Sequence, residues 1–226
     1  MTSIDLRSVR KGFGGDCIVR EASATFTRGV HLIEGENGAG KTTLLRMLSG
    51  SILPTCGEVL LDGVSVHRRK VRERGRIVMV SAEPAFYDGA SVEFALRMYR
   101  AVCGLPSTRD IFEGFDPFLL STKRAVAFGD LSLGWKKRLT LHMGFMCDVD
   151  VVVLDEPTVG LDDSGVDVLA ALIRGRSAGR MTFFTSHEAG WLADQPIGRY
   201  LLDRRPHGSV LVTLGDADCQ GRYHSH

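Results

Sequence analysis

The chain has 226 residues, of which 44% are hydrophobic and 24% charged, and its formal net charge at pH 7 is +1. This length suits one large domain or a domain with a smaller lobe, and the near-neutral charge gives no overall argument for a nucleic-acid partner. No apolar run approaches the roughly 18 residues of a membrane span, and the first residues lack the apolar core of a signal peptide, so a cytoplasmic location is expected.

The cysteines are Cys17, Cys56, Cys103, Cys147 and Cys219, and they form no C-x-x-C pair. An odd number of scattered cysteines in a cytoplasmic chain is typical of reduced thiols rather than of metal ligands. We therefore predict that they are reduced and mostly structural.

The first part of the chain is rich in β-forming segments, and the last of these is an apolar strand at residues 30–34. Residues 35–42 read GENGAGKT, which fits G-x-x-x-x-G-K-[ST] at every fixed position, and a helix is predicted to follow over residues 42–48. In this context Lys41 would reach the β- and γ-phosphates of a nucleotide, and the hydroxyl of Thr42 would bind Mg²⁺. The alternative, a glycine-rich turn with an incidental lysine, does not explain why strand, loop and helix all agree with the motif.

Further strands are predicted at residues 58–61 and 77–80. The intervening basic run, residues 67–76, lacks interleaved aromatic residues on which bases could stack, which favours a solvated connection over a nucleic-acid patch. From Ser91 to about Leu120 the apolar residues have helical spacing, and another helix follows Leu131. This pattern predicts a helical insertion between sheet strands.

Residues 151–154 are Val-Val-Val-Leu, as expected of a strand buried on both faces of a parallel sheet, and Asp155 and Glu156 follow directly. Ligands of open α/β sheets bind at this edge, so the pair suggests a metal ligand beside a general base. An ordinary acidic turn is the alternative. The rest of the chain predicts a helix near residues 166–173, a strand at 181–185 and terminal strands around 200–203 and 210–214, which completes an α/β fold.

Both motifs, together with LSLGW at residues 131–135, resemble the nucleotide-binding domain of ATP-binding cassette (ABC) proteins from about Ile4 to Asp203. LSLGW is similar to the family signature Leu-Ser-Gly-Gly-Gln and retains Ser132 and Gly134. The resemblance implies a P-loop NTPase with a mainly parallel core sheet, flanking helices, an antiparallel β edge and a helical subdomain. It also implies one domain over residues 1–226, with a core of about 1–86 and 150–226 and a helical subdomain of about 87–149.

The family pattern implies a role for individual positions. The nucleotide-binding residues would be Phe13, Gly35, Glu36, Asn37, Gly38, Ala39, Gly40, Lys41, Thr42, Thr43, Ser132, Gly134 and Asp162. Thr42 and Asp155 would hold Mg²⁺, and Lys41, Glu156 and His187 would be catalytic, with Glu156 polarising the attacking water. Simpler roles remain open for several of them: Ser132 and Asp162 can cap helices, Phe13 can be a core residue, and a histidine after a strand is usually structural.

Two positions depart from the family pattern. Ala82, in VSAEP, stands where the family usually has a glutamine whose carboxamide can reach Mg²⁺ and water, so slower or differently coupled hydrolysis is expected. Trp135 replaces the glutamine of the signature, and the sequence does not decide between an exposed contact and a core anchor.

The resemblance implies that ATP and Mg²⁺ are sandwiched between the P-loop of one subunit and the signature of a second ABC ATPase subunit. Closure by ATP and reopening by hydrolysis would drive an integral membrane permease, docked near Ala82 to Glu93, with the chain peripheral on the cytoplasmic face. Residues 91–106 resemble exporter subunits more than importers. The alternatives are a non-transport ABC ATPase and an ATP-dependent regulatory module with weak hydrolysis. No nucleic-acid partner is expected.

Overall fold

The computed structural model of the chain describes residues 2–68, 76–106, 108–186, 190–192 and 194–214. Its strands are β1 (Ile4–Phe13), β2 (Asp16–Phe26), β3 (Gly29–Glu34), β4 (Cys56–Leu61), β5 (Val64–Ser65), β6 (Ile77–Val80), β7 (Val151–Leu154), β8 (Met181–Thr185), β9 (Ile197–Asp203) and β10 (Ser209–Leu214). Its α-helices are α1 (Lys41–Leu48), α3 (Val92–Val102), α4 (Leu133–Met146) and α5 (Asp163–Arg176). Short 3-10 turns lie at Leu120–Lys123, Phe128–Asp130 and Gly190–Leu192.

One mixed sheet connects the described strands in the order β5-β4-β1-β2-β10-β9-β3-β8-β7-β6. The strands β9, β3, β8, β7 and β6 run parallel. Thr182 of the central strand β8, for example, lies between Val30 of β3 and Val152 of β7. The strands β1, β2, β4 and β5 pair antiparallel, and β10 joins the two parts by pairing with both β9 and β2. The predicted α/β fold with a parallel core and an antiparallel edge is confirmed.

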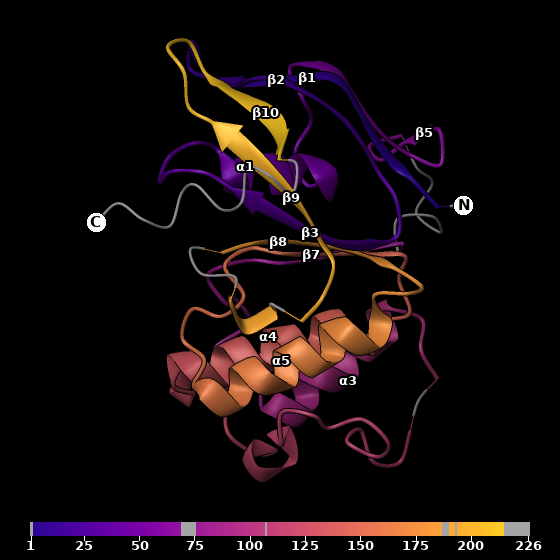
Figure 1. The fold of residues 1–226 in the computed structure, drawn as a ribbon. Helices are drawn as coiled ribbons and strands as arrows, with labels where there is room; N and C mark the ends of the chain where they lie inside the picture. Colours follow the sequence, from indigo (N-terminus) through magenta and orange to yellow (C-terminus); the bar gives the residue numbers. More distant parts are fainter. Residues whose placement is uncertain (1, 69–75, 107, 187–189, 193, 215–226) are drawn as a thin grey trace.

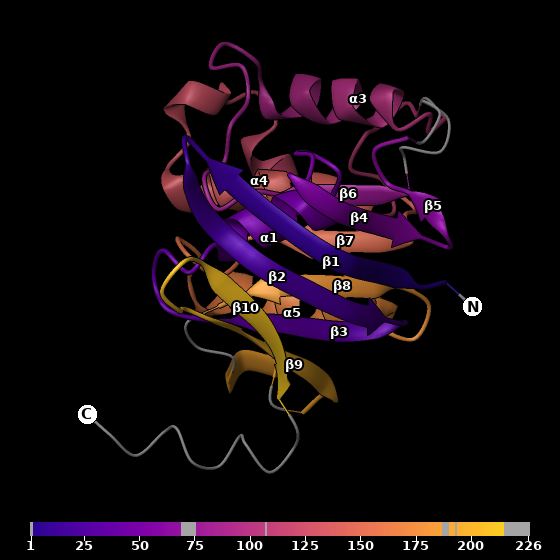
Figure 2. The same cartoon turned by 90° about the horizontal axis from the view of Figure 1, so that it is seen from above.

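The helices lie on both faces of the parallel strands (Figure 1). Helix α1 lies between these strands and the antiparallel part, whereas α3, α4 and α5 cover the opposite face. Seen from above, β1 and β2 cross over α1 and the core strands (Figure 2). The chain therefore has two apolar cores, one on each face of the parallel strands.

Strand β7 shows how the sequence produces these two cores. All its residues are buried, and side chains alternate between the faces of a strand. Val151 and Val153 pack in the core around α1, and Val152 and Leu154 pack in the core beneath α4 and α5. Both faces of β7 thus pack against apolar residues, which explains why its four residues are all apolar.

Side chains cap the first turns of the three helices on the far face. The hydroxyl of Ser91 accepts from the N–H of Phe94 at 3.2 Å and begins α3. The hydroxyl of Ser132 does the same at the start of α4, at 3.5 Å, and the carboxylate of Asp162 accepts from the N–H of Gly165 at 2.9 Å. Such caps satisfy N–H groups that have no partner inside the helix, and they fix where α4 and α5 begin.

The helical pattern predicted from Ser91 to about Leu120 ends earlier than expected. Helix α3 stops at Val102, and no described residue from 103 to 119 is helical. The reason is local: Gly104 takes a left-handed backbone, with φ of 68°, and Pro106 cannot continue a helix.

The prediction that the cysteines are reduced is wrong for one pair. Cys103 and Cys147 form a disulfide that closes a sequence separation of 44 residues. They are the C-cap residues of α3 and α4, so the packing of the two helices brings their last turns together. Cys17 and Cys56 are free and exposed, and Cys219 lies outside the described residues.

None of the described helices combines the length and the apolar character needed to cross a membrane.

Candidate nucleotide site

The glycine-rich loop joins the end of β3 to the start of α1, at the carboxyl edge of the parallel strands. Gly40 is the N-cap of α1 with φ of 95°, and a Cβ there would lie 2.7 Å from a methyl carbon of Ile18. Gly38 is also left-handed, with φ of 77°. Gly40 therefore has no room for a side chain, and the backbone at Gly38 favours glycine. No described side chain caps this end of α1, so its first N–H groups are available to an anion.

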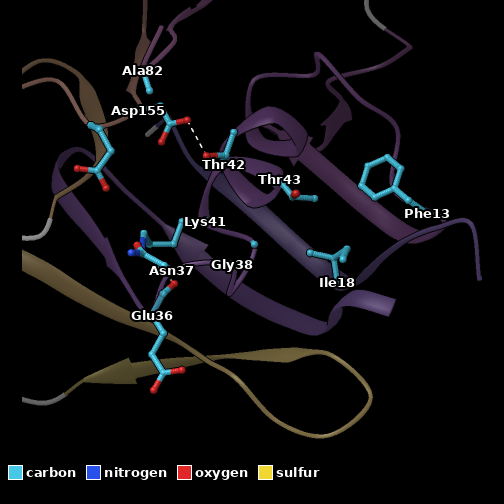
Figure 3. A pocket seen from close by; sticks show the side chains of 12 residues that line it. Phe13, Ile18, Glu36, Asn37, Gly38, Lys41, Thr42, Thr43, Ala82 and Asp155 are labelled. Carbon is cyan, nitrogen blue, oxygen red and sulfur yellow. Dashed lines mark hydrogen bonds between the residues drawn. The ribbon is translucent and has the colours of Figure 1, made fainter. Parts of the chain in front are cut away.

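A cavity of about 490 Å³ opens beside this loop (Figure 3). Its lining residues are Phe13, Ile18, Glu36, Asn37, Gly38, Gly40, Lys41, Thr42, Thr43, Ala82, Asp155 and Glu156. The cavity thus joins the two motifs, which stand more than a hundred positions apart in the sequence.

Lys41 and Phe13 mark two regions of this cavity, and in Figure 3 they are well separated. The Lys41 ammonium donates to the carbonyl oxygens of Gly35 at 2.7 Å and Glu36 at 3.3 Å, which holds its charge over the loop. Phe13 is 52% exposed rather than buried in the core, and the Lys11 ammonium lies 4.7 Å from its ring centre. One region therefore offers a cation, and the other an exposed aromatic face.

Asp155 connects the cavity to both neighbouring elements, although it is only 3% exposed. The hydroxyl of Thr42 donates to Oδ2 of Asp155 at 2.7 Å, and the hydroxyl of Thr185, at the end of β8, donates to Oδ1 at 2.8 Å. Each carboxylate oxygen thus has a hydroxyl partner, which satisfies a buried charge. The first bond fixes the loop against the end of β7 (Figure 3).

Glu156 has an unusual backbone for a residue other than glycine, with φ of 43°. Its N–H donates to the hydroxyl of Thr185 at 2.9 Å, the same hydroxyl that donates to Asp155. A left-handed glutamate costs about 1–3 kcal/mol and persists where its surroundings hold it in place. Strain at a cavity wall is typical of a functional residue.

Thr42 and Asp155 offer neighbouring oxygen donors that suit Mg²⁺. This ion usually takes one or two protein oxygens and completes its octahedral shell with water and substrate phosphates. Among the described residues, no group of three or more His, Cys, Asp or Glu could hold a metal on its own. The donor set therefore fits Mg²⁺ bound together with a phosphorylated ligand.

Lys137, in the second turn of α4, is fully buried behind this cavity. Its ammonium donates to the carbonyl oxygens of Ser81 at 3.3 Å, Ala82 at 3.2 Å and Asp155 at 3.3 Å. Burial lowers the pKa of Lys137 to about 8, and the negative charges of Asp155 and Glu156 act in the opposite direction. A buried cation thus lies directly behind the two carboxylates.

A second cavity, of about 560 Å³, lies where α4 and α5 begin. It is lined by Leu119, Thr122, Ser132, Gly134, Trp135, Arg138, Gly160, Asp162 and Ser164. A Cβ on Gly134 would lie 2.7 Å from the carbonyl oxygen of Gly160, so α4 can approach this loop because residue 134 is glycine. The ring of Trp135 lies 5.0 Å from the guanidinium of Arg138 and packs partly against the core, so it is both a cavity contact and an anchor.

Asp162 is held by several donors in this second cavity. Its Oδ1 accepts from the N–H of Gly165 at 2.9 Å, from Arg138 at 2.6 Å and from the hydroxyl of Ser164 at 3.0 Å. These bonds, the one to Gly165 first, lower the pKa of Asp162 to about 2. Asp162 is therefore the cap of α5 and a fixed negative charge at the cavity wall.

The two cavities hold almost all the residues that the sequence singles out. The exceptions are Ala39, which is fully buried in the core around α1, and Gly35, which contributes its carbonyl oxygen to Lys41. His187 lies outside the described residues.

Sequence reasoning missed Ile18 and Arg138, which line the cavities, and Thr185 and Lys137, which donate hydrogen bonds to Asp155. The positions of all four depend on the packing of distant segments. For Thr185, its position at the end of an apolar strand was an available signal, because polar residues at that edge face ligands.

Comparison with known proteins agrees with this geometry. The ABC transporter family matches residues 19–159. The Nod factor export ATP-binding protein I of Rhizobium johnstonii is 33% identical over 230 residues, which cover 94% of this chain and 72% of that protein. The protein of the same name from Burkholderia lata is 35% identical over 228 residues, which cover 94% of this chain and 74% of that protein.

Solved structures show the same fold. An ATP-binding subunit of an ABC transporter superposes with a TM-score of 0.83 at 19% identity, covering 96% of this chain and 92% of that one. A bacterial Atm1-family ABC exporter with ATP bound gives a TM-score of 0.75 at 20% identity, covering 89% of this chain and 37% of the exporter chain. With its phosphate-binding loop and its acidic strand end meeting in one cavity, the chain belongs to the ABC transporter family.

Proposed function

We propose that this chain is the ATP-hydrolysing subunit of an exporter and works through a separately encoded membrane permease. As a member of the ABC transporter family it uses ATP to power transport. The observation that carries the proposal is the hydrogen bond from Thr42 to Asp155, which places the phosphate-binding loop against the carboxylates at the end of β7. The names of the Rhizobium and Burkholderia relatives contain the word export, which supports export as the direction of transport.

In this proposal the first cavity binds ATP along its length. The phosphates lie against the N–H groups of the loop and the first turn of α1, where the helix dipole favours negative charge, and the Lys41 ammonium turns from the loop carbonyls to the β- and γ-phosphates. The exposed ring of Phe13 is available to stack on adenine. Phe13 and Lys41 line separate regions of the same cavity, as a nucleotide with its phosphates at one end would require.

Thr42 and Asp155 would hold Mg²⁺, which neutralises charge on the phosphates. Glu156 would orient the attacking water and accept its proton, a contribution of about 10²- to 10⁴-fold in rate for a well-placed base. His187, which lies outside the described residues, is proposed to contact the γ-phosphate. Asp155 is the weaker candidate for the base, because it is buried and assigned to Mg²⁺ together with Thr42.

The second cavity supports the proposal that the chain works as a dimer. The cavity shares no lining residue with the first, as expected if each cavity contributes half of a site completed by a partner. Ser132 and Gly134 at the start of α4 would face the γ-phosphate of ATP bound to the partner's loop, and Asp162 would lie beside it. The partner subunit is a second ABC ATPase of the same or a different kind.

The permease is proposed to dock near Ala82 to Glu93 and on the adjoining helix α3. These segments begin the helical part, residues 87–149, which we propose acts as a subdomain that moves against the core. A cavity of about 280 Å³ lies between residues 79–86 and the helices α3 and α4. Phe94, Met98 and Val102, four residues apart along α3, are exposed and form an apolar row, and Tyr87 is 78% exposed. Exposed apolar rows of this kind are typical of a surface that receives a helix from another protein.

Ala82 favours a second candidate, a regulatory module with weak hydrolysis. It lines the first cavity beside Asp155, yet its side chain can neither donate nor accept a hydrogen bond. The exporter is preferred because Lys41, Thr42, Asp155 and Glu156 all line the same cavity.

Recovery of the tagged chain from detergent-solubilised membranes of its own organism tests the assignment. An integral membrane protein is expected to co-purify, and Met98→Asp, in the apolar row of α3, is expected to release it. Leu53→Asp is the matched control, because Leu53 is also exposed but lies in the connection between α1 and β4. Recovery that is purely soluble, or bound to ribosomes, would count against an exporter.

A further inference from the structure

The peptide group between Asp155 and Glu156 is held from both sides. Its carbonyl oxygen accepts from the Lys137 ammonium at 3.3 Å, and its N–H donates to the hydroxyl of Thr185 at 2.9 Å. The lysine comes from α4 and the threonine from β8, so elements on different sides of β7 fix one peptide plane. The orientation of this plane determines the direction in which the Glu156 side chain leaves the backbone.

These two hydrogen bonds restrain the backbone of Glu156, which is in an unfavourable conformation. Glu156 has φ of 43°, a conformation that only a surrounding structure can maintain in a glutamate. If the carbonyl of Asp155 lost its donor, the peptide could rotate toward an ordinary extended or helical backbone, and the carboxylate of Glu156 would turn away from its place. The bond from Lys137 therefore bears on geometry rather than on nucleotide affinity.

Lys137 also reaches the neighbouring strand end. A lysine ammonium has three donors, and here they serve Asp155 at the end of β7 and Ser81 and Ala82 at the end of β6. The side chain is fully buried and takes no part in lining the cavity, so it touches neither a ligand there nor solvent. Its position in α4 is five residues after Ser132, in the helix whose N-terminus lines the second cavity.

We propose that Lys137 is a positioning residue for ATP hydrolysis, which orients Glu156 through the Asp155–Glu156 peptide and links that peptide to α4 and to the Ala82 segment. The proposal rests on the role of Glu156 as the base in the proposed function. Because α4 begins at the second cavity, a shift of this helix on partner binding would change the orientation of Glu156 in the first cavity. Closure and hydrolysis would then be connected through one buried side chain.

Lys137→Met tests this, since methionine keeps most of the length and removes the charge and the donors. The expected result is a fall in kcat of roughly 10- to 100-fold, the range that small misplacements of catalytic groups produce, with KM and the Kd of a fluorescent ATP analogue within about threefold of wild type. Lys136→Met is the matched control, because Lys136 precedes it in the same helix, is partly exposed and donates to Gly129. Its kcat is expected to stay within about twofold of wild type.

Two further measurements separate positioning from a purely structural role. Lys137→Gln, which keeps an N–H donor pair without the charge, should give an intermediate kcat, and it serves as the test if the methionine variant does not fold. In a Glu156→Gln background, Lys137→Met should cause no further loss, because the residue acts through Glu156.

A folded Lys137 variant with kcat near wild type would overturn the proposal, as would a loss that appears in ATP affinity instead of kcat. An additive loss in the double variant would overturn it as well. Failure of the proposed function looks different: Glu156→Gln would then hydrolyse ATP normally, whatever the Lys137 variants do.

Discussion

The two cavities differ in the side chains that they have available for chemistry. In the first, the cation of Lys41 and the carboxylates of Asp155 and Glu156 lie around an open space, with a hydroxyl bridging loop and strand. In the second, the one carboxylate among the described lining residues, that of Asp162, is engaged by three donors and has a pKa of about 2. The first cavity therefore has side chains free to act on a ligand, whereas the carboxylate of the second is committed to holding the start of α5. In the proposed dimer, each cavity would supply half of one nucleotide site.

The largest expected effect belongs to the first cavity. Glu156→Gln should lower the steady-state ATPase rate by about 10²- to 10⁴-fold, because an amide cannot accept the proton of the attacking water. ATP binding should persist, since Lys41 and the loop are untouched, and the variant should accumulate as an ATP-bound dimer in size-exclusion chromatography. Normal turnover in this variant would show that the catalytic group lies elsewhere and would remove the contrast between the cavities.

Gly134→Ala tests the second cavity. The new Cβ would lie 2.7 Å from the carbonyl oxygen of Gly160, so the start of α4 and the Gly160 loop must move apart. We expect a loss of ATPase activity of about tenfold or more, with ATP affinity of the isolated chain unchanged, because the two cavities share no residue.

Gly175→Ala is the control for that substitution, since Gly175 lies in α5 with no atom near its missing Cβ. It should leave the ATPase rate unchanged and raise the free energy of unfolding by about 0.5–1 kcal/mol, because alanine favours a helix. If Gly134→Ala weakens ATP binding to the monomer instead, the two cavities are not separate half-sites.

Ala82→Gln tests whether the missing glutamine limits ATP hydrolysis in the first cavity. The carboxamide would add a donor and an acceptor near Asp155 and Glu156. The ATPase rate should therefore rise by about twofold to tenfold, which corresponds to an activation free energy lower by up to about 1.4 kcal/mol. The measurement is steady-state ATPase against Mg²⁺ concentration. Equal rates and equal Mg²⁺ dependence for both proteins would show that the missing glutamine does not limit hydrolysis.

The smallest expected effect concerns the charge in the second cavity. Arg138→Gln removes one donor to Asp162, so the pKa of that carboxyl should rise from about 2 while staying below its usual value, because the N–H of Gly165 still donates. Since the folded pKa is depressed, the stability gained from this cap is present above the ordinary carboxyl pKa and is lost as the pH falls toward 2. NMR titration of the Asp162 carboxyl carbon measures the shift, and an unchanged pKa would mean that Arg138 contributes nothing to it.

Much of the first cavity could be predicted from the sequence because its residues lie in short motifs. The loop glycines and Lys41 are adjacent in the chain, and the valines before Asp155 reveal a buried strand whose end must reach the ligand edge. The positions of most strands along the chain, and of the helices on the far face, also follow from local apolar patterns.

The side chains that support the cavity could not be predicted in the same way. Lys137 reads as one of three successive basic residues on a helix that would ordinarily face solvent. Only the packing of α4 against β6 and the segments that follow β6 and β7 buries it. Thr185 serves both carboxylate residues because β8 lies beside β7, a neighbour relation that sequence order does not give. The pairing of Cys103 with Cys147 depends likewise on where two helices end.

That disulfide changes the connectivity of the helical part. It closes the chain between the last turns of α3 and α4 into a covalent ring, so a single cut anywhere inside it leaves both fragments attached. Trypsin cleavage at the exposed Arg124 should therefore give one band on a gel without reductant and two with it. The row on α3 and the signature at the start of α4 would stay physically joined through such a cut, because their connection does not depend on the peptide segment between them.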